Sequence, residues 1–260
     1  MKIVIGQGSC GIAAGAEKVR KALLNCNLNG AKLTIAGCIG MCYLEPIVDI
    51  YDDNGDVKRL VRVAEKDAEK IAEYAQTGNE SAIADLLVSD EDKEFLDKQT
   101  RIALRRCGII NPESIDEFVE AEGYSALKKV VTSMTPEDVI DVIKVSGLAG
   151  RGGAGFPTWF KWNAARQSED DEKYLICNAD EGDPGAFMDR AVIESDPHNL
   201  IEGMLIGAYA IGAKNAVVYV RAEYPLAIKR LEKAIDDATE KGYLGENIFG
   251  TDFSCTMTIK

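Results

Sequence analysis

The chain has 260 residues, of which 46% are hydrophobic and 28% are charged. This is an ordinary globular composition, which excludes disordered, collagen-like and small disulfide-stabilised proteins. No apolar run approaches the roughly 18 residues that span a bilayer. The first residues loosely resemble a signal peptide, but the polar Gln7-Gly8-Ser9 interrupts them, and we therefore expect a cytoplasmic protein.

The charge and the rare residue types narrow the function further. The 30 Lys and Arg against 43 Asp and Glu give a net charge of −13, which argues against nucleic acid as a partner. The one histidine, His198, argues against histidine-rich zinc sites, and at its helix start we expect a surface or capping residue rather than a proton donor. The seven cysteines, an odd number, indicate thiols or metal ligands rather than a disulfide framework.

Residues 1–78 are predicted to form a compact α/β unit. The pattern predicts strands at 3–5 and 33–36, a helix over 11–25, a hairpin of 47–51 with 57–63, and a helix over 64–75. The hairpin turn contains Asn54-Gly55, a strong hairpin signal, and Gly78 stops the last helix. Residues 79–100 are polar and acidic, and we interpret them as a linker.

Residues 101–260 are predicted to form a second α/β domain. Strands are expected at 174–177, 216–220 and 254–259, between helices that start at Asn111-Pro112, Thr135-Pro136, Thr158, Pro197 and Pro225. Alternating strands and helices favour a mostly parallel sheet. The chain stops within the last strand, so we expect this domain to be cut before its end.

A glycine-rich loop over 147–155 carries the densest signal. Its glycines let backbone N–H groups approach a ligand, and the following helix start favours phosphate. Gly150, Gly152 and Gly155 satisfy the spacing G-x-G-x-x-G, but a helix rather than a strand precedes them, which excludes the classical dinucleotide reading. A plain surface loop is disfavoured by the aromatic residues that follow, which are Phe156, Trp159, Phe160 and Trp162.

An acidic segment, Cys177 to Arg190, follows a predicted strand. It therefore lies at the strand's carboxyl end, where open α/β sheets bind ligands. Asn178 offers an amide, and Asp180, Glu181 and Asp183 offer carboxylates, which suit ribose hydroxyls or a flavin edge. Glycoside hydrolysis or a hard metal would also use paired carboxylates, but neither explains the glycine-rich loop. For Asp183-Pro184-Gly185 alone, a simple turn is an equal alternative.

Three stretches together resemble a known family. Residues 150–161, 177–190 and 219–225 are similar to the flavin- and NADH-binding subunit of respiratory complex I, and to its soluble relatives in NAD-linked hydrogenases and formate dehydrogenases. The resemblance implies a Rossmann-like domain that binds FMN and NAD(H). It implies that the loop and the acidic segment bind these cofactors through Gly150, Arg151, Gly152, Gly153, Ala154, Gly155, Phe156, Lys161, Asn178, Asp180, Glu181 and Asp183, with Glu181 closest to the chemistry.

The chain also departs from that family. A second flavin segment and a four-cysteine motif for a 4Fe–4S cluster follow in the family but are not found within these 260 residues. Trp159 stands where many members have glycine, and Ala164 where the respiratory enzyme has an aromatic residue.

The N-terminal unit resembles a thioredoxin-like 2Fe–2S ferredoxin. Cys38 and Cys42 match the second ligand pair of that family, and Cys10 matches one member of the first pair. The other member is expected at position 5, which is Ile5, and Cys26 is a poor replacement. A 2Fe–2S cluster held by Cys10, Cys38 and Cys42, or a domain without a cluster, are both open interpretations.

We therefore interpret the chain as an electron-transfer flavoprotein subunit. Hydride would pass between NAD(H) and FMN, and electrons would pass to or from iron–sulfur clusters of partner subunits. The alternative is a non-catalytic scaffold or assembly subunit derived from the same family.

Overall fold

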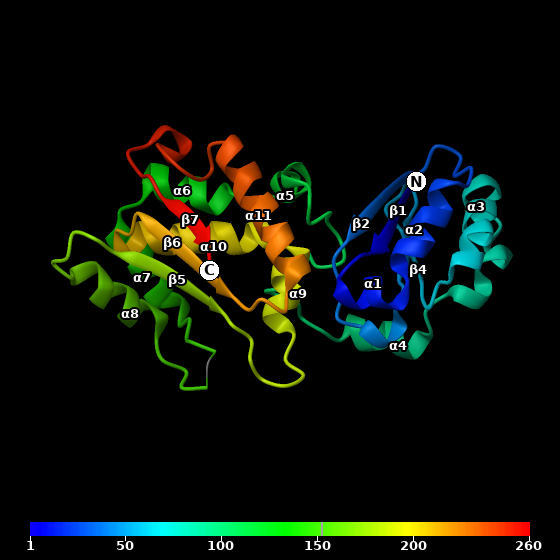
Figure 1. Ribbon diagram of the computed structural model, residues 1–260, viewed down its shortest axis with the longest axis horizontal. Helices are drawn as coiled ribbons and strands as arrows, with labels where there is room; N and C mark the ends of the chain where they lie inside the picture. The colour runs from blue at the N-terminus through cyan, green and yellow to red at the C-terminus, as the bar shows by residue number, and fades with distance from the viewer. Residues whose placement is uncertain (152) are drawn as a thin grey trace. The chain divides into compact units, whose positions relative to one another are not determined.

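The structure is a computed structural model that describes residues 1–151 and 153–260 (Figure 1). These residues form two compact units. The N-terminal unit comprises residues 1–114 and 191–196, and the C-terminal unit comprises residues 115–190 and 197–260. The domain boundaries expected at 78 and 101 stay a prediction. Among the described residues, no helix is both long and apolar enough to cross a membrane.

The N-terminal unit is built on a four-stranded sheet. Its strands are β1 (Lys2–Gly6), β2 (Lys32–Ala36), β3 (Val48–Tyr51) and β4 (Val57–Leu60), in the order β2-β1-β3-β4. β1 pairs parallel with β2 and antiparallel with β3, and β4 completes the predicted hairpin. With the helices α2 (Ala16–Leu24) and α3 (Ala68–Thr77), this is the thioredoxin-like arrangement that the sequence predicted.

The first predicted helix is two helices in the structure. α1 (Ser9–Ala14) begins before the expected position, and α2 begins at Ala16. Gly15 lies between them with φ of +106°, a left-handed conformation that glycine adopts without steric cost. The apolar periodicity runs through this break, which is why the sequence pattern did not show it.

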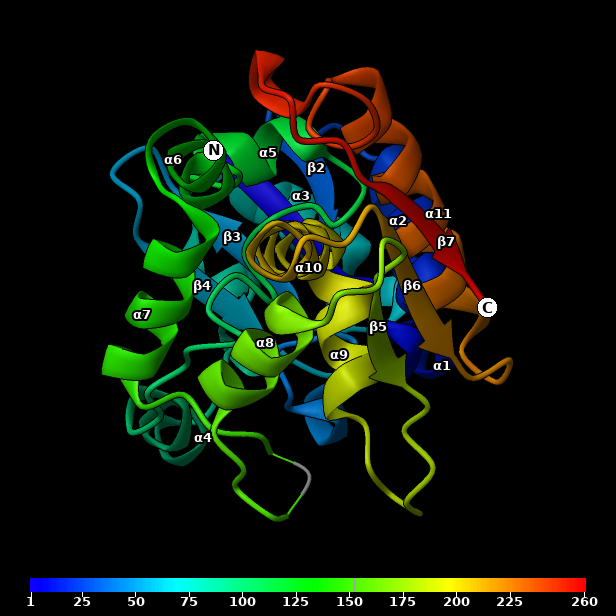
Figure 2. The ribbon, with the colours of Figure 1, turned by 90° about the vertical axis from the view of Figure 1, so that its left-hand side faces the viewer.

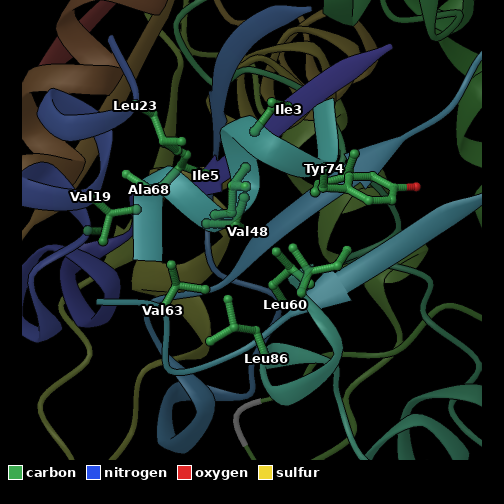
Figure 3. Packing of buried hydrophobic residues seen from close by; sticks show 14 residues of the cluster. Ile3, Ile5, Val19, Leu23, Val48, Leu60, Val63, Ala68, Tyr74 and Leu86 are labelled. Atoms are coloured by element: carbon green, nitrogen blue, oxygen red, sulfur yellow. The ribbon is translucent and has the colours of Figure 1, made fainter. Parts of the chain in front are cut away.

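The core of the N-terminal unit lies between the sheet and its helices (Figure 3). Ile3 and Ile5 of β1 are fully buried and pack against side chains from α2, α3, β3 and β4. Burying one such aliphatic side chain contributes roughly 1.5–3 kcal/mol. The labelled side chain of Ile5 lies within this cluster.

Residues 79–100 differ from the linker that their composition suggests. They contain the short 3-10 turns η3 (Glu80–Ala82) and η4 (Ala84–Leu86) and the helix α4 (Asp90–Asp97). Ile83 and Leu86 are buried in the core, and Val88 and Leu96 pack against a second apolar cluster. A few apolar residues in a polar stretch were enough to attach it, and composition alone does not detect so sparse a pattern.

One helix beyond residue 114 contributes to the N-terminal unit. α9 (Met188–Ser195) was not predicted, and its last residues belong to this unit. Glu194 accepts hydrogen bonds from the backbone and the hydroxyl of Ser9. Asp196 forms a buried ion pair with Arg106, with 2.8 Å between Oδ2 and Nε. Gly37 has no room for a side chain, because a Cβ there would lie 1.9 Å from the Ser195 hydroxyl oxygen.

The C-terminal unit contains a three-stranded parallel sheet. Its strands are β5 (Tyr174–Ala179), β6 (Asn215–Val220) and β7 (Thr256–Ile259), in that order. α10 (Pro197–Ile211) packs on β5 and β6, and Figure 2, which views α10 almost along its axis, shows the strands on one side of it and α7 (Pro136–Ser146) on the other. The parallel sheet is therefore confirmed.

The other helices of this unit agree in part with the sequence. α7, α8 (Thr158–Gln167), α10 and α11 (Pro225–Glu240) lie where they were expected. Thr135 caps α7 through a reciprocal hydrogen-bonded box with Asp138. The helix expected at Asn111-Pro112 begins later, as α5 (Ile115–Glu120), and α6 (Ser125–Ser133) was missed. The remaining 3-10 turns of the chain are η1 (Cys42–Leu44), η2 (Glu65–Asp67) and η5 (Ile248–Gly250).

His198 is in the core of the C-terminal unit, so its predicted surface position was wrong. Its side chain is 2% exposed, and its Nδ1 shares a hydrogen bond of 2.9 Å with the Tyr124 hydroxyl. The ring of Phe118 lies 5.4 Å away, centroid to centroid. Burial lowers the pKa of His198 to about 4, so the imidazole is neutral at pH 7.

The buried imidazole makes a prediction about acid stability. The unfolded chain binds a proton near pH 6.5 and the folded chain only near pH 4, so His198 removes stability as the pH falls between these values. The expected loss is about 3 kcal/mol between pH 7 and pH 4. The measurement is thermal unfolding across this range for the wild type and for His198→Gln. An equal loss in both proteins would contradict the prediction.

Candidate functional site

Three cysteines meet in the N-terminal unit. Cys10 lies in α1, Cys38 follows β2, and Cys42 begins η1. Their sulfur atoms all lie within 4.8 Å of one another, and the Sγ atoms of Cys38 and Cys42 are 3.8 Å apart. The backbone N–H of Gly40 donates to the Cys38 sulfur at 3.3 Å. The structure thus brings together the three residues that the sequence selected, and thiolates are the usual ligands of iron–sulfur clusters.

The three thiols influence one another electrostatically. A hydrogen bond from Cys38 lowers the pKa of the Cys10 thiol to about 6, so Cys10 ionises first. The same bond, with burial, raises the pKa of Cys38. Burial raises the pKa of Cys42 as well. A bound cation would remove this mutual repulsion and draw all three into the thiolate form.

The structure also shows where a fourth ligand does not come from. Ile5 points into the hydrophobic core with no exposed surface, so a thiol at position 5 would not reach the three sulfurs. The expectation that position 5 carries the missing ligand is therefore wrong, because successive side chains of a strand point to opposite faces. Cys26 lies at the end of α2, where its thiol donates to the Ala22 carbonyl.

The glycine-rich loop is closed at its base by backbone hydrogen bonds. The N–H of Gly150 donates to the Phe156 carbonyl at 2.8 Å, and that of Thr158 donates to the Leu148 carbonyl at 3.0 Å. Gly153 and Gly155 have φ of +95° and +60°, which favours glycine. The predicted contact at Gly152 lies outside the described residues. These two hydrogen bonds hold the two ends of the loop together.

The loop tip and the acidic segment line one open cavity of about 640 Å³. This volume lies within the range of roughly 300–1,000 Å³ that is usual for a small-molecule site. Five of the predicted site residues line it together, and they are Arg151, Asn178, Asp180, Glu181 and Asp183. Gly182, Ala186 and Asp189 complete the lining, and sequence analysis had not selected these three. Asp189 opens α9, the helix that the sequence did not reveal.

Glu181 is held in place by three hydrogen bonds. Its carboxylate accepts from the backbone N–H groups of Asp189 and Arg190 at 3.0 and 3.2 Å, and from the Tyr224 hydroxyl at 3.2 Å. Its backbone carbonyl accepts from the Arg221 guanidinium. The N–H groups of a first helical turn lack partners within the helix, so this carboxylate caps α9 from a distance. Glu181 therefore has a structural role that its sequence motif did not predict.

The charge of the cavity is mostly negative. Asp180, Glu181, Asp183 and Asp189 face one cation, Arg151. Burial and the charge of Glu181 raise the pKa of Asp189. Carboxylates accept hydrogen bonds from sugar hydroxyls, and Arg151 can bind an anionic group. The lining of the cavity, with four carboxylates and one arginine, thus fits the hydroxyl-bearing part of a nucleotide better than it fits an isolated phosphate.

Of the aromatic residues after the loop, Phe156 and Phe160 are exposed, and Trp159 and Trp162 are half-buried. Phe156 is 43% exposed, its ring lies edge-to-face with Phe160, and Lys161 Nζ lies 5.5 Å from its ring centroid. Lys144 Nζ lies over the Trp159 ring at 4.8 Å. An exposed phenylalanine with a cation over its ring is available to stack on a planar ligand.

A cavity at the carboxyl end of a parallel strand lies where open α/β sheets bind their ligands. Residues 143–259 match the family described as the Nuo51 FMN-binding domain.

Curated proteins show the same relationship. The chain is 62% identical over 163 residues to the NADP-reducing hydrogenase subunit HndC of Solidesulfovibrio fructosivorans, covering 63% of this chain and 33% of that protein. It is 47% identical over 158 residues to a subunit of the NADH-quinone oxidoreductase of Rhizobium meliloti (strain 1021), covering 61% and 38%. The chain thus spans about a third of the length of these relatives.

A solved structure is similar to the N-terminal part. The wild-type thioredoxin-like [2Fe-2S] ferredoxin from Aquifex aeolicus is 17% identical, with a TM-score of 0.29, covering 34% of this chain and 96% of that one.

The capping role of Glu181 makes a prediction about stability. We expect Glu181→Ala to lower the free energy of unfolding by about 1–2 kcal/mol, because two N–H groups of α9 and the Tyr224 hydroxyl lose their acceptor. Asp183→Ala is the matched control, because Asp183 lines the same cavity and the described residues give its carboxylate no such bonds. Denaturant unfolding of both variants measures the difference. Equal stability of the two variants would contradict the capping role.

Proposed function

We propose that the protein is the NAD(H)-oxidoreducing flavoprotein subunit of a multi-subunit electron-transfer complex. The observation that carries the proposal is that the candidate cavity lies within the segment that matches a flavin-binding family. The segment that matches the Nuo51 FMN-binding domain family contains the cavity at the carboxyl end of β5. Relatives that carry this segment are named as subunits of NADH-quinone oxidoreductase and of an NADP-reducing hydrogenase.

The residues of the cavity have distinct roles in this proposal. FMN, when bound, supplies the group that takes up or releases hydride. Arg151 and the loop N–H groups hold the anionic part of a nucleotide, and Asn178 with Asp180 and Asp183 accept hydrogen bonds from its hydroxyls. Phe156 would stack on the nicotinamide nucleotide, and Lys161, whose Nζ lies near the Phe156 ring, would help to hold the phosphate or ring of FMN. Glu181, fixed by α9 and Tyr224, places a negative charge beside the flavin.

The three clustered thiols fit the electron-transfer part of the proposal. Cys10, Cys38 and Cys42 would hold a 2Fe–2S cluster that exchanges electrons with iron–sulfur subunits of the same complex. A 4Fe–4S cluster is assigned to no residue of this chain. The partners are thus NAD(H) and other electron-transfer subunits rather than nucleic acid. All seven cysteines are free thiols, which agrees with a reducing compartment such as the cytoplasm.

A second candidate is a scaffold or assembly subunit derived from the same family. The observation that favours it is the charge of the cavity, in which four carboxylates face a single arginine. Such a surface repels a phosphate unless further cations are supplied. The presence or absence of flavin in the protein distinguishes the two functions.

The glycine-rich loop provides the variant for this test. Gly153→Val should weaken FMN retention at least about tenfold, because a side chain at positive φ costs about 1–2 kcal/mol and stands where the ligand approaches. Gly242→Val is the matched control, because Gly242 has φ of +73°, also has open space around it, and lies far along the chain from the loop.

The measurement is flavin fluorescence released on denaturation from protein purified anaerobically out of the cells that make it. The wild type and Gly242→Val should release FMN, and Gly153→Val should release little. Reduction of the bound flavin by NADH or NADPH then identifies the nucleotide. Absence of flavin from the wild type would favour the scaffold, and normal flavin in Gly153→Val would exclude the loop from the site.

A further inference from the structure

A buried carboxylate beside the three cysteines has an oxygen without a partner. Glu45 follows η1 and is 7% exposed. Its Oε2 accepts a hydrogen bond of 2.8 Å from the Ile47 N–H, whereas the buried Oε1 has no hydrogen-bond partner among the described residues. A buried polar atom without a partner costs about 1–3 kcal/mol, and a functional role or a bound ion is one of the reasons for which native proteins retain it.

Asp49, a neighbouring buried acid, does have a charged partner, so burial in this part of the unit does not by itself leave a carboxylate without one. Asp49 lines the same small cavity of about 10 Å³ as Glu45. Asp49 receives two hydrogen bonds from Arg59, at 2.8 and 2.7 Å, and is thereby neutralised. No such cation pairs with Glu45 among the described residues.

The Glu45 carboxylate lies beside the segment that carries Cys10. A Cβ on Gly11, the residue after Cys10, would lie 3.0 Å from its Oε2. The carboxylate does not join the compact group in which every pair of ligand atoms is within 4.8 Å. A cluster of two irons spreads its four terminal ligands over two metal ions, so it accepts a donor at the edge of the group.

The Glu45 carboxylate lies next to the space that a side chain at position 6 would occupy. A Cβ on Gly6 would lie 3.1 Å from both carboxylate oxygens of Glu45. Gly6 does not have positive φ, so its backbone does not require glycine. Position 6 faces away from the core side chain of Ile5, since side chains alternate along β1. Glycine at 6 is thus explained by the carboxylate that lies over it.

We propose that the Glu45 carboxylate is the fourth protein ligand of the iron–sulfur site formed by Cys10, Cys38 and Cys42. The inference rests on the cluster in the proposed function. Oε1 would bind iron, while Oε2 keeps its bond to the Ile47 N–H. The carboxyl and the three thiols each give a proton to solvent, and no electron is transferred in the binding. The charge of the ligand set equals that of four thiolates, but one donor is a hard oxygen.

The test uses the 260-residue chain reconstituted anaerobically with ferric iron and sulfide, so that iron enters in the oxidation state of the oxidised 2Fe–2S cluster and no further oxidant is needed. The wild type is expected to retain a 2Fe–2S cluster, and Glu45→Ala to bind iron at least about tenfold more weakly. The double variant Gly6→Cys with Glu45→Ala places a thiol in the vacated space and should recover the iron. Its charge-transfer bands should move to longer wavelength, because thiolate is the softer donor, and the electron paramagnetic resonance of its reduced cluster should differ from that of the wild type.

Asp49→Asn is the control, because it removes a buried carboxylate from the same cavity without removing the proposed ligand. It should retain iron and the wild-type resonance. Iron, sulfide and resonance unchanged in Glu45→Ala would overturn the inference and leave the cluster itself intact. No iron in the wild-type chain would instead overturn the cluster, and with it the ligand. Circular dichroism of each variant separates loss of iron from loss of fold.

Discussion

Both candidate sites depend on the same constraint, which is that paired parallel strands end at the same edge of a sheet. In the C-terminal unit, Ala179 of β5 pairs with Val220 of β6. The residues that follow each strand must therefore meet, and the Arg221 guanidinium indeed donates to the Glu181 carbonyl. The cavity lies where the segment after β5 leaves the sheet, and the glycine-rich loop adds Arg151 to its lining.

The N-terminal unit uses the constraint in the same way. Gly6 at the end of β1 pairs with Ala36 at the end of β2. The segments after these strands carry Cys10 and Cys38, and the pairing brings the two sulfurs together although 28 residues separate them. Cys42 lies four residues after Cys38, and the two sulfur atoms are 3.8 Å apart. The thiolate cluster is thus a consequence of strand pairing, and the core around Ile3 and Ile5 holds that pairing.

The acidic side chains of this molecule fall into two groups, those with hydrogen-bond partners in the chain and those with an oxygen that has no such partner. Asp49, Glu181 and Glu194 accept hydrogen bonds from a cation, N–H groups or hydroxyls, and each of them fixes a segment of chain. Glu45 differs from these three, because its Oε1 is buried without a hydrogen-bond partner among the described residues. The cavity acids Asp180 and Asp183 face open space, where a ligand's hydroxyls can reach them. The acidity of the chain therefore reflects several separate local requirements.

The amino-acid sequence determined the features that depend on neighbours along the chain. The capping box at Thr135, the proline starts of α10 and α11, the hairpin turn and the glycine-rich loop are all local patterns, and the structure contains them. The cysteines and acids that the motifs selected do come together, because each lies just after a strand that could be predicted.

The tertiary structure decided what depends on residues far apart in sequence. It buried His198 beside Tyr124, attached residues 79–100 through Ile83 and Leu86, and gave α9 a cap from Glu181. It also placed the Glu45 carboxylate next to Gly6, whereas the side chain of Ile5 lies in the hydrophobic core. The physical reason is that the burial of a polar group depends on which distant donors and acceptors pack against it. Such partners leave no periodic or spacing signal in the chain itself.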